Sequence, residues 1–281
     1  MSKTSSNLKS VAWLKNHLTE PNLVILDASM LKMPNGNLIP AGKNCIPGSK
    51  RFNYDTEICD QLSDLPHMMP REEEFQTAAQ SLGINNQSTI IVYDRIGIFA
   101  SPRAWWMFKV MGHQNVFVLD GGYPKWQAAG YAIEEHFSTP NSKGDFCATF
   151  DERKIAKQND ILENISSQSN QLIDARSLAR FHAKEPEPRP ELAGGHIPNS
   201  TCLPFTELID HGLMKSPQQL SDIFANRLAD QKQNIIFSCG SGVTACILAL
   251  GASECGLDDY SVYDGSWTEW ALDESTPKVR E

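Results

Sequence analysis

Long apolar runs are missing from this chain of 281 residues. No stretch of about 18 apolar residues occurs, so a transmembrane helix is not expected. The first residues, MSKTSSNLKS, contain no apolar segment of the kind found in secretory signals. No Cys-x-x-Cys pair and no histidine pair at metal-ligand spacing is present, which argues against a structural zinc site. The 7 cysteines are scattered, and their odd number favours reduced thiols in the cytoplasm over a disulfide framework.

An excess of positive charge is also missing. Lys and Arg number 25 against 34 Asp and Glu, which gives a net charge of −9. A non-specific nucleic-acid binder needs a basic surface, so nucleic acid is not an expected partner. A local pair of arginines can still bind a small anionic substrate in such a chain. The composition, 41% hydrophobic and 21% charged, is typical of a globular protein, and the length suggests about two domains.

The chain repeats itself at an offset of about 145 residues. Four blocks recur in the same order, which chance similarity of short apolar runs does not explain. The paired blocks are 23–29 with 171–177, 45–49 with 196–200, 90–94 with 235–239, and 118–126 with 262–270. The sequence therefore predicts a duplicated domain, with one copy at 8–138, a linker at 139–160 and a second copy at 161–279.

Short apolar or β-branched runs alternate with helical stretches in each copy. Bounded runs of this kind predict buried strands of a parallel sheet. They lie at 23–27, 90–93, 116–120, 171–174, 234–238 and 260–263. Residues 101–111 and 243–251 predict helices, whereas 184–195 contains three prolines and predicts a loop. The fold class is therefore α/β, with two similar domains that each contain a parallel sheet flanked by helices.

Cys239 stands where a predicted strand ends, in the segment C-G-S-G-V-T-A-C at 239–246. Gly240 and Gly242 allow a tight turn that gathers backbone N–H groups around the sulfur, and a helix begins near Val243. Both features favour an anion, so Cys239 is expected to be a reactive thiolate beside a cradle for an anionic intermediate. The alternative is a buried cysteine at a strand end. The matching residue of the first copy is Asp94, which predicts that the first domain is non-catalytic.

These residues resemble those of the two-domain rhodanese-like sulfurtransferases over nearly the whole chain. The loop CGSGVT at 239–244 is similar to the active-site loop of 3-mercaptopyruvate sulfurtransferases. Thiosulfate-preferring relatives usually carry basic residues after the cysteine, where this chain has Gly240 and Ser241. The blocks 262–270 and 196–198 resemble the family's C-terminal and N-terminal signatures. The first copy departs from the second signature, because Cys45 stands in place of the histidine.

The resemblance implies a set of site residues. Arg180 and Arg189 fall on the family's two substrate-binding arginines, and a guanidinium pairs well with the carboxylate and ketone of mercaptopyruvate. The alternative is a pair of surface arginines on a solvated loop. Three catalytic residues are implied: Cys239, Ser241 and His67. The active-site loop adds four more candidates for substrate binding: Gly240, Gly242, Val243 and Thr244.

His67 is implied to act from the first domain across the domain interface. Family proposals link a serine of the loop, this histidine and an acidic residue in a proton relay. Here the serine is Ser241, and the sequence leaves the acid open among Asp55, Glu57 and Asp60.

Several other residues are expected to be structural. Arg103 is expected to brace the domain interface, and Arg176 to pair with Asp174. The apolar surroundings of Cys246 predict burial. Further expectations are core positions for Trp105, Trp106, Cys202 and Cys255, and possible exposure for Cys59 and Cys147.

The reaction implied by the resemblance is sulfur transfer from 3-mercaptopyruvate through a persulfide on Cys239, with release of pyruvate. The acceptor is a thiol, such as thioredoxin or a small thiol, or cyanide; no metal or organic cofactor is needed. Three alternatives remain at this stage: a thiosulfate:cyanide sulfurtransferase, a non-catalytic rhodanese-like binding module, and a cysteine phosphatase. The last would need an arginine at the end of the loop to hold phosphate, and residues 244–246 contain none.

Overall fold

The computed structural model describes residues 6–33, 37–39, 44–228 and 234–280. Within them the chain forms two five-stranded sheets, in the orders β1-β5-β4-β2-β3 and β6-β12-β11-β7-β8. All strand pairs within both sheets are parallel. The two orders match strand for strand, so the duplication expected from the sequence is present in the fold.

The first sheet and its helices occupy the N-terminal half of the chain. Its strands are β1 (Leu8–Lys9), β2 (Leu23–Asp27), β3 (Lys50–Arg51), β4 (Thr89–Tyr93) and β5 (Val116–Leu119). Its helices are α1 (Val11–His17), α2 (Glu72–Ser81), α3 (Ser101–Val110) and α4 (Gly122–Ala128).

The second sheet and its helices occupy the C-terminal half. Its strands are β6 (Ile155–Ala156), β7 (Asn170–Asp174), β8 (Ser200–Cys202), β11 (Asn234–Ser238) and β12 (Tyr260–Tyr263). Its helices are α5 (Gln158–Ser167), α6 (Leu178–Phe181), α7 (Pro217–Ala225), α8 (Ala245–Glu254) and α9 (Ser266–Leu272). Two short 3-10 turns, Glu152–Lys154 and Phe205–Leu208, and a small hairpin, β9 (Ile209–Asp210) with β10 (Leu213–Met214), complete this half.

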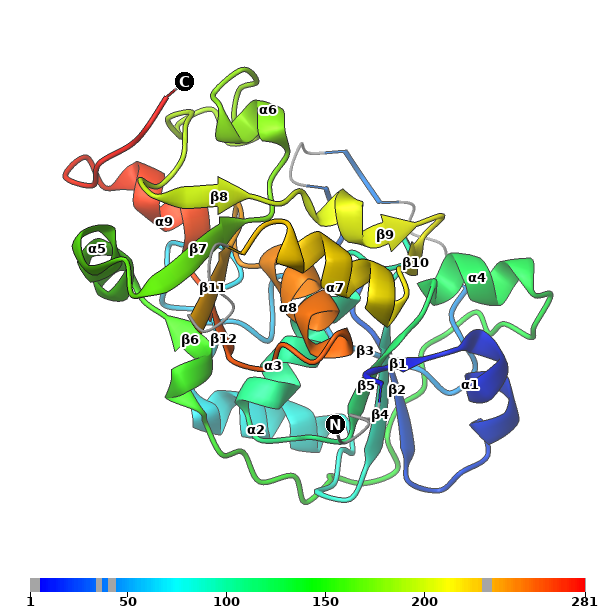
Figure 1. Cartoon of the computed structure of the whole chain (residues 1–281). Coiled ribbons are helices and arrows are strands. Elements are labelled where there is room, and N and C mark those ends of the chain that lie inside the picture. The colour runs from blue at the N-terminus through cyan, green and yellow to red at the C-terminus, as the bar shows by residue number, and fades with distance from the viewer. Residues whose placement is uncertain (1–5, 34–36, 40–43, 229–233, 281) are drawn as a thin grey trace.

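Both faces of each sheet are buried, because alternate side chains of a strand point to opposite sides. In β4, Ile90 and Val92 pack into the central hydrophobic cluster, whereas Ile91 packs on the outer face beneath α1 and α4. In β11, Phe237 faces the same central cluster and Ile236 faces α5 and α9. Figure 1 shows α1 and α4 at one end of the molecule, α5 and α9 at the other, and α3 and α8 between the sheets.

The two domains share one continuous hydrophobic core. It contains residues of both sheets together with nearly the whole of α3 and α8, which pack against each other. Trp105 and Trp106 of α3 are both buried in this core, as the sequence predicts. Helix α8 is buried along almost its full length, as a helix between two sheets must be. The domain interface is therefore closely packed, and it fixes which residues of the first domain lie near the Cys239 loop of the second.

The segment 139–160, predicted to be a linker, contributes in part to the second domain. Ile155 and Ala156 form β6, which pairs with β12 at the edge of the second sheet, and α5 begins at Gln158. Two apolar residues are too short a run to indicate a strand, so only the pairing with β12 reveals it. The helix predicted from Val243 begins two residues later, at Ala245, whereas 184–195 forms no strand or helix, as expected.

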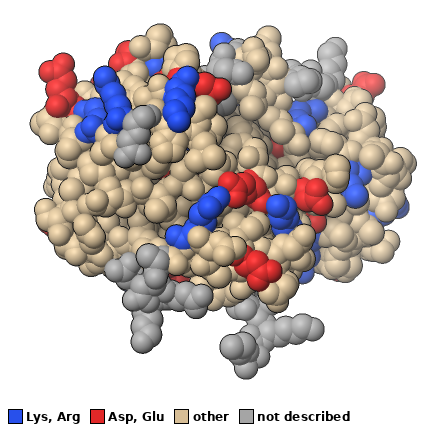
Figure 2. All heavy atoms as spheres, turned by 45° about the horizontal axis from the view of Figure 1, so that its top comes forward, with Lys and Arg blue, Asp and Glu red and all other residues tan. Residues whose placement is uncertain are grey.

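Charge is distributed over the surface without a patch of one sign on the face seen in Figure 2, where Lys and Arg side chains lie among Asp and Glu. Within the described part of the chain, every helix is too short or too polar to cross a membrane.

Candidate active site

The Cys239 loop lies at the carboxyl edge of the second sheet, between the end of β11 and the start of α8. In a parallel sheet the carboxyl ends of neighbouring strands meet at this edge, where ligands commonly bind. Ser238, the last residue of β11, pairs with Asp174, the last residue of β7. The segments that follow these two strands therefore lie side by side, and they carry Cys239 and Arg180.

The start of α9 holds the Cys239 loop in place. The backbone N–H groups of Trp267 and Thr268 donate to the carbonyl oxygens of Cys239 and Gly240, at 3.0 and 2.9 Å. The hydroxyl of Thr268 donates to the Gly240 oxygen as well, at 2.6 Å. Sequence reasoning missed Thr268, because only the folded chain brings α9 against the loop.

Ser266 is a second anchor that sequence reasoning missed. Its Oγ accepts hydrogen bonds from the N–H groups of Cys239 and Gly242, each at 3.1 Å, and donates to the Tyr263 oxygen at 2.7 Å. The same Oγ lies 3.9 Å from Cys239 Sγ. Ser266 has a positive φ of 51°, a rare conformation for a residue with a side chain, which this hydrogen bonding holds in place.

Close packing restricts two glycines of the loop, and Gly242 more strictly than Gly240. A Cβ on Gly240 would lie 3.1 Å from Arg180 Nη2, so a side chain here would press on the guanidinium. Gly242 has a φ of +73°, and a Cβ there would lie 2.8 Å from the Asp264 carbonyl oxygen. Gly242, predicted to contact substrate, does not line the cavity, because its N–H is bound to Ser266 and its carbonyl oxygen to Arg103.

Several N–H groups of the Cys239 loop have no partner within the described part of the chain. They belong to Gly240, Ser241, Val243, Thr244 and Ala245. Buried N–H groups are nearly always hydrogen-bonded, so such a set marks a place for an acceptor, above all an anion.

The corresponding loop of the first domain already holds an anion, the carboxylate of Asp94. Its two oxygens accept hydrogen bonds from five backbone N–H groups, at 2.8 to 3.0 Å, and from the Ser101 hydroxyl at 2.7 Å. Three of those N–H groups, on Ile96, Phe99 and Ala100, correspond by the repeat to Ser241, Thr244 and Ala245. The duplicated loop therefore binds negative charge in the first domain, and the N–H groups of Ser241, Thr244 and Ala245 have no partner among the described residues.

Cys239 lines a cavity of about 250 Å³ between the two domains. Its thiol belongs to a residue only 1% exposed, so the cavity is its route to a substrate. Its polar lining includes Arg180, Arg189 and Ser241, and the rest of its lining is largely apolar. The remaining lining residues are Met30, Met33, Phe99, Arg176, Ser177, Pro188, Phe205, Gly240, Val243 and Thr244. All but two of the predicted site residues meet here; Gly242 lies behind the loop and His67 lies in a neighbouring cavity.

Arg180 is held by a buried carboxylate that sequence reasoning missed. Ser177 caps the short helix α6 by accepting from the Arg180 N–H, and the Arg180 guanidinium pairs with Glu187 at 2.5 Å. The other oxygen of Glu187 binds Arg176 at 2.7 Å. Glu187 lies in the proline-rich segment, and its position beneath both arginines depends on how that loop folds back.

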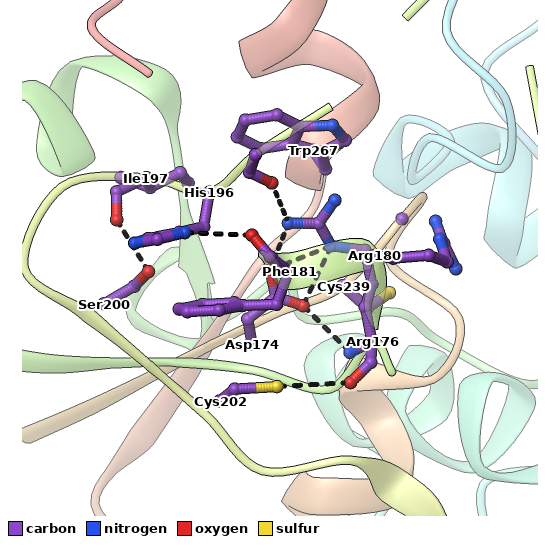
Figure 3. A network of polar contacts seen from close by, with 12 residues as sticks. Asp174, Arg176, Arg180, Phe181, His196, Ile197, Ser200, Cys202, Cys239 and Trp267 are labelled. Carbon is purple, nitrogen blue, oxygen red and sulfur yellow. Dashed lines mark hydrogen bonds and ion pairs between the residues drawn. The ribbon is translucent and has the colours of Figure 1, made fainter. Parts of the chain in front are cut away.

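Arg176 pairs with Asp174 at 2.7 Å, as the sequence predicts, and also donates to the Gly195 oxygen at 2.8 Å. Figure 3 shows Asp174 and Arg176 joined by hydrogen bonds, with Arg180 and Cys239 beside them. His196, from the second-domain signature, stacks on Phe181 with ring centroids 3.8 Å apart and thereby supports the end of α6. This network fixes the place from which Arg180 faces the cavity.

Arg189 faces the cavity with weaker internal contacts. Within the described residues its guanidinium makes one hydrogen bond, to Thr268 Oγ1 at 3.4 Å. Burial lowers the pKa of Arg189, and the nearby Arg180 adds to this effect while Glu191 opposes it. Two half-buried guanidinium groups lie beside one thiol, and an anionic ligand bound there would pair with both positive charges.

His67 pairs with Asp55, which settles in geometric terms the choice among three acids. His67 Nδ1 lies 3.1 Å from Asp55 Oδ1, and this contact lowers the pKa of the Asp55 carboxyl. Glu57 instead accepts a hydrogen bond from Asn53, and Asp60 from the Leu62 N–H. No hydrogen bond joins His67 to Ser241 within the described residues, so the three groups do not form a connected chain in this structure.

Arg103 joins the Cys239 loop to the His67 segment across the interface. Its buried guanidinium pairs with Asp264 at 2.7 Å and donates to the carbonyl oxygens of Gly242, at 3.3 Å, and His67. Asp264 in turn accepts from the Met69 N–H at 2.8 Å. The expected bracing role of Arg103 is confirmed, and its contacts couple the loop of Cys239 to the segment of His67.

Cys45, Cys59, Cys202, Cys246 and Cys255 lie in environments that disfavour the thiolate. Burial raises the pKa of Cys246, and it raises that of Cys202 to about 12 and of Cys255 to about 11. Cys202 and Cys255, expected in the core, are only partly buried; Cys59 is also partly buried, and Cys147 is exposed.

The chain belongs to the rhodanese-like family: the profile described as "Rhodanese-like domain" matches residues 10–129 and 157–273. It is 39% identical to the 3-mercaptopyruvate sulfurtransferase of Rattus norvegicus over 274 residues, which cover 94% of this chain and 92% of the relative. It is also 39% identical to the mitochondrial thiosulfate/3-mercaptopyruvate sulfurtransferase 1 of Arabidopsis thaliana, over 98% of this chain and 78% of the relative. Among solved structures it resembles SseA of Escherichia coli, described as a 3-mercaptopyruvate sulfotransferase, with a TM-score of 0.84, 35% identity and coverage of 94% and 99%.

Proposed function

We propose that this protein is a sulfurtransferase that takes sulfur from 3-mercaptopyruvate, carries it as a persulfide on Cys239 and passes it to a thiol or to cyanide. The observation that carries the proposal is that Cys239 shares a cavity with Arg180 and Arg189 and adjoins N–H groups for which the described part of the chain supplies no partner. The similarity to curated 3-mercaptopyruvate sulfurtransferases supports the choice of donor.

Donor binding uses the polar lining of the cavity. The carboxylate and ketone of 3-mercaptopyruvate accept from Arg180 and Arg189, and the mercapto sulfur then faces Cys239. The planar, paired donors of a guanidinium suit adjacent oxygens better than a single ammonium group would. The apolar lining excludes water around the sulfur.

In the first half-reaction the Cys239 thiolate attacks the donor sulfur. A bond forms between the two sulfurs, the carbon–sulfur bond of the donor breaks, and its electron pair leaves on pyruvate as the enolate. Protonation at the methylene carbon gives pyruvate. This is covalent catalysis that divides one transfer into two steps, so ping-pong kinetics are expected.

The loop then holds the persulfide. The outer sulfur of a cysteine persulfide and the oxygens of an aspartate each lie two bonds from Cβ. The Asp94 carboxylate, with five N–H donors in the first domain, therefore indicates how the N–H donors on Ser241, Thr244 and Ala245 stabilise the persulfide anion.

Proton transfer is assigned to Ser241, His67 and Asp55. Ser241 lies beside Cys239 in the cavity, and Asp55 orients the His67 ring from Nδ1. The absence of a direct bond between Ser241 and His67 in the described residues means that the relay would form only with a substrate, or a water, between them.

Gly240 and Ser241 favour 3-mercaptopyruvate over thiosulfate in this proposal, because neither adds a cation after Cys239. Thioredoxin and small thiols are the acceptors we propose, and the cytoplasm is the proposed location. All seven cysteines are free thiols, which suits a reducing compartment.

The test is intact mass and turnover on one preparation. Incubation with 3-mercaptopyruvate should add one sulfur atom to the wild-type protein and none to Cys239→Ser, which should retain the fold but not transfer sulfur. A higher kcat/KM for 3-mercaptopyruvate than for thiosulfate is expected. A sulfur-free wild type would support a binding module instead, and sulfur gained by Cys239→Ser would place the nucleophile elsewhere.

A further inference from the structure

A second cavity of about 390 Å³ adjoins the one that contains Cys239. The segment from Asp55 to His67 of the first domain lines one side of it, and Arg189, Glu191 and Thr268 of the second domain line the other. Arg189 is common to both cavities. Thr268 Oγ1 contacts Arg189 and also donates to the Gly240 oxygen, so these two side chains link the second cavity to the Cys239 loop.

The walls of the second cavity carry mostly negative charge. Asp60, Asp64 and Glu191 line it in addition to Asp55, whereas Arg189 and His67 are the cationic or titratable basic groups in its lining. The first cavity differs, because its lining contains three arginines and no carboxylate. An anionic donor therefore fits the first cavity, and a positively charged molecule fits the second.

His67 lines the second cavity with a ring whose Nε2 is bonded to nothing in the described part of the chain. The residue is 7% exposed, and its Nδ1 faces Asp55. A nearly buried imidazole with one free nitrogen at a cavity wall is suited to accept a proton from a bound group.

We propose that the second cavity binds the sulfur acceptor, and that it selects small aminothiols, in which an ammonium group lies close to the thiol. The ammonium group sits near Asp64 and Glu191, and the thiol points past Arg189 toward Cys239. This inference rests on the proposed function, because it needs a persulfide on Cys239.

The transfer step is balanced without any further reactant. The acceptor thiol gives its proton to His67 Nε2, and the resulting thiolate attacks the outer sulfur of the Cys239 persulfide. A new sulfur–sulfur bond forms on the acceptor, the persulfide bond of the enzyme breaks, and Cys239 leaves as a thiolate that can take the proton back. Pyruvate has left by then, so Arg189 is free of the donor carboxylate and can move aside.

Cys59 also lines the second cavity but is not suited to relay the sulfur. Burial raises the pKa of its thiol, with Asp55 adding to the effect, and Gln61 donates a hydrogen bond to its sulfur at 3.1 Å. A neutral, hydrogen-bonded thiol is a weak nucleophile. The acceptor must therefore come from outside the chain.

Cysteamine and 2-mercaptoethanol test the inference, because they differ mainly in an ammonium group against a hydroxyl. The acceptor kcat/KM of each is measured with saturating 3-mercaptopyruvate, and the ratio of the two is compared between enzymes. In Asp64→Asn/Glu191→Gln the ratio should fall about threefold to tenfold, the range for two exposed charge contacts. The difference in acidity between the two thiols is the same for every enzyme and cancels in this comparison.

The matched control is Glu163→Gln/Asp222→Asn, which removes the same charge from exposed positions outside the cavity. Its ratio should equal that of the wild type, and added salt should reduce the wild-type ratio because exposed charges are screened. An unchanged ratio in the cavity variant, or an equal fall in the control, would overturn the acceptor site. Mass analysis without acceptor separates the two proposals: a persulfide that forms normally leaves the proposed function intact, and its absence would overturn both.

Discussion

Replacement of Arg189 by alanine tests how the donor is recognised. Arg180 is already paired with Glu187 at 2.5 Å, whereas Arg189 has one contact of 3.4 Å with Thr268. A substrate carboxylate that binds Arg189 therefore replaces only a weak contact of this guanidinium, so nearly the full free energy of the charge-assisted hydrogen bond contributes to binding. Such bonds are worth roughly 1.5–3 kcal/mol, which corresponds to about a tenfold to 150-fold loss of kcat/KM for 3-mercaptopyruvate.

The same substitution should affect thiosulfate much less, because thiosulfate has no carboxylate and ketone to orient. Arg180→Ala should impair both donors, since it also leaves Glu187 short of a partner beside the site. Arg189→Lys should restore activity only in part, because one ammonium group cannot replace the planar fork. Arg153→Ala, at a side chain that is 86% exposed, is the control for loss of one positive charge.

The assay compares kcat/KM for the two donors with each variant on matched preparations. Equal losses on both donors for Arg189→Ala would show that Arg189 attracts anions in general. Full activity of Arg189→Lys would show that the fork geometry is irrelevant. Either result would refute the reasoning from the two arginines.

Three further predictions follow from the contacts around the site. Asp94→Ala leaves five N–H donors without their acceptor, so it should lower the free energy of unfolding by about 3–5 kcal/mol in denaturant titrations. Persulfide formation on Cys239 should persist in the folded fraction. Undiminished stability would contradict the role given to the Asp94 carboxylate. Arg103→Lys keeps the charge, but its single ammonium nitrogen cannot span the acceptors that Arg103 bonds through two separate guanidinium nitrogens, so kcat should fall at temperatures where the variant is fully folded, with an unchanged kcat as the adverse result. The contact with His67 lowers the pKa of Asp55, so this carboxylate stabilises the fold above its ordinary pKa of 3.8, and the stabilisation is lost as pH falls through the lower pKa of the folded state. Urea unfolding at several pH values gives the stability difference between wild type and Asp55→Asn, which should shrink below about pH 4. A difference that stays constant with pH would count against the pair.

Local patterns in the sequence determined the duplicated α/β fold. Bounded apolar runs such as 90–93 and 234–238 are direct consequences of strands buried on both faces, so they could be read without the structure. The position of Cys239 after such a run, with glycines on both sides of Ser241, likewise indicated a strand–loop–helix turn. The edge strand at 155–156 could not be found in this way, because its signal comes only from pairing with β12.

The sequence could not identify residues whose important contacts are made with residues elsewhere in the chain. It left Asp55, Glu57 and Asp60 open as partners of His67, and only the folded 53–67 segment brings Asp55 within 3.1 Å of the ring. It did not indicate Ser266, which holds the Cys239 loop from 27 residues away.

The charge environment of the site was decided by tertiary structure as well. Arg180 and Arg189 were indicated by the family resemblance, but their difference was not, because it depends on Glu187 folding beneath one of them and not the other. The two adjoining cavities, one lined by arginines and one by carboxylates, exist only where the two domains meet. The sequence by itself determined the duplication, the central strands and the position of Cys239 at the end of one of them, since each follows from residues close together in the chain. The tertiary structure decided the partners of each charged group, since electrostatic interactions depend on distance in space.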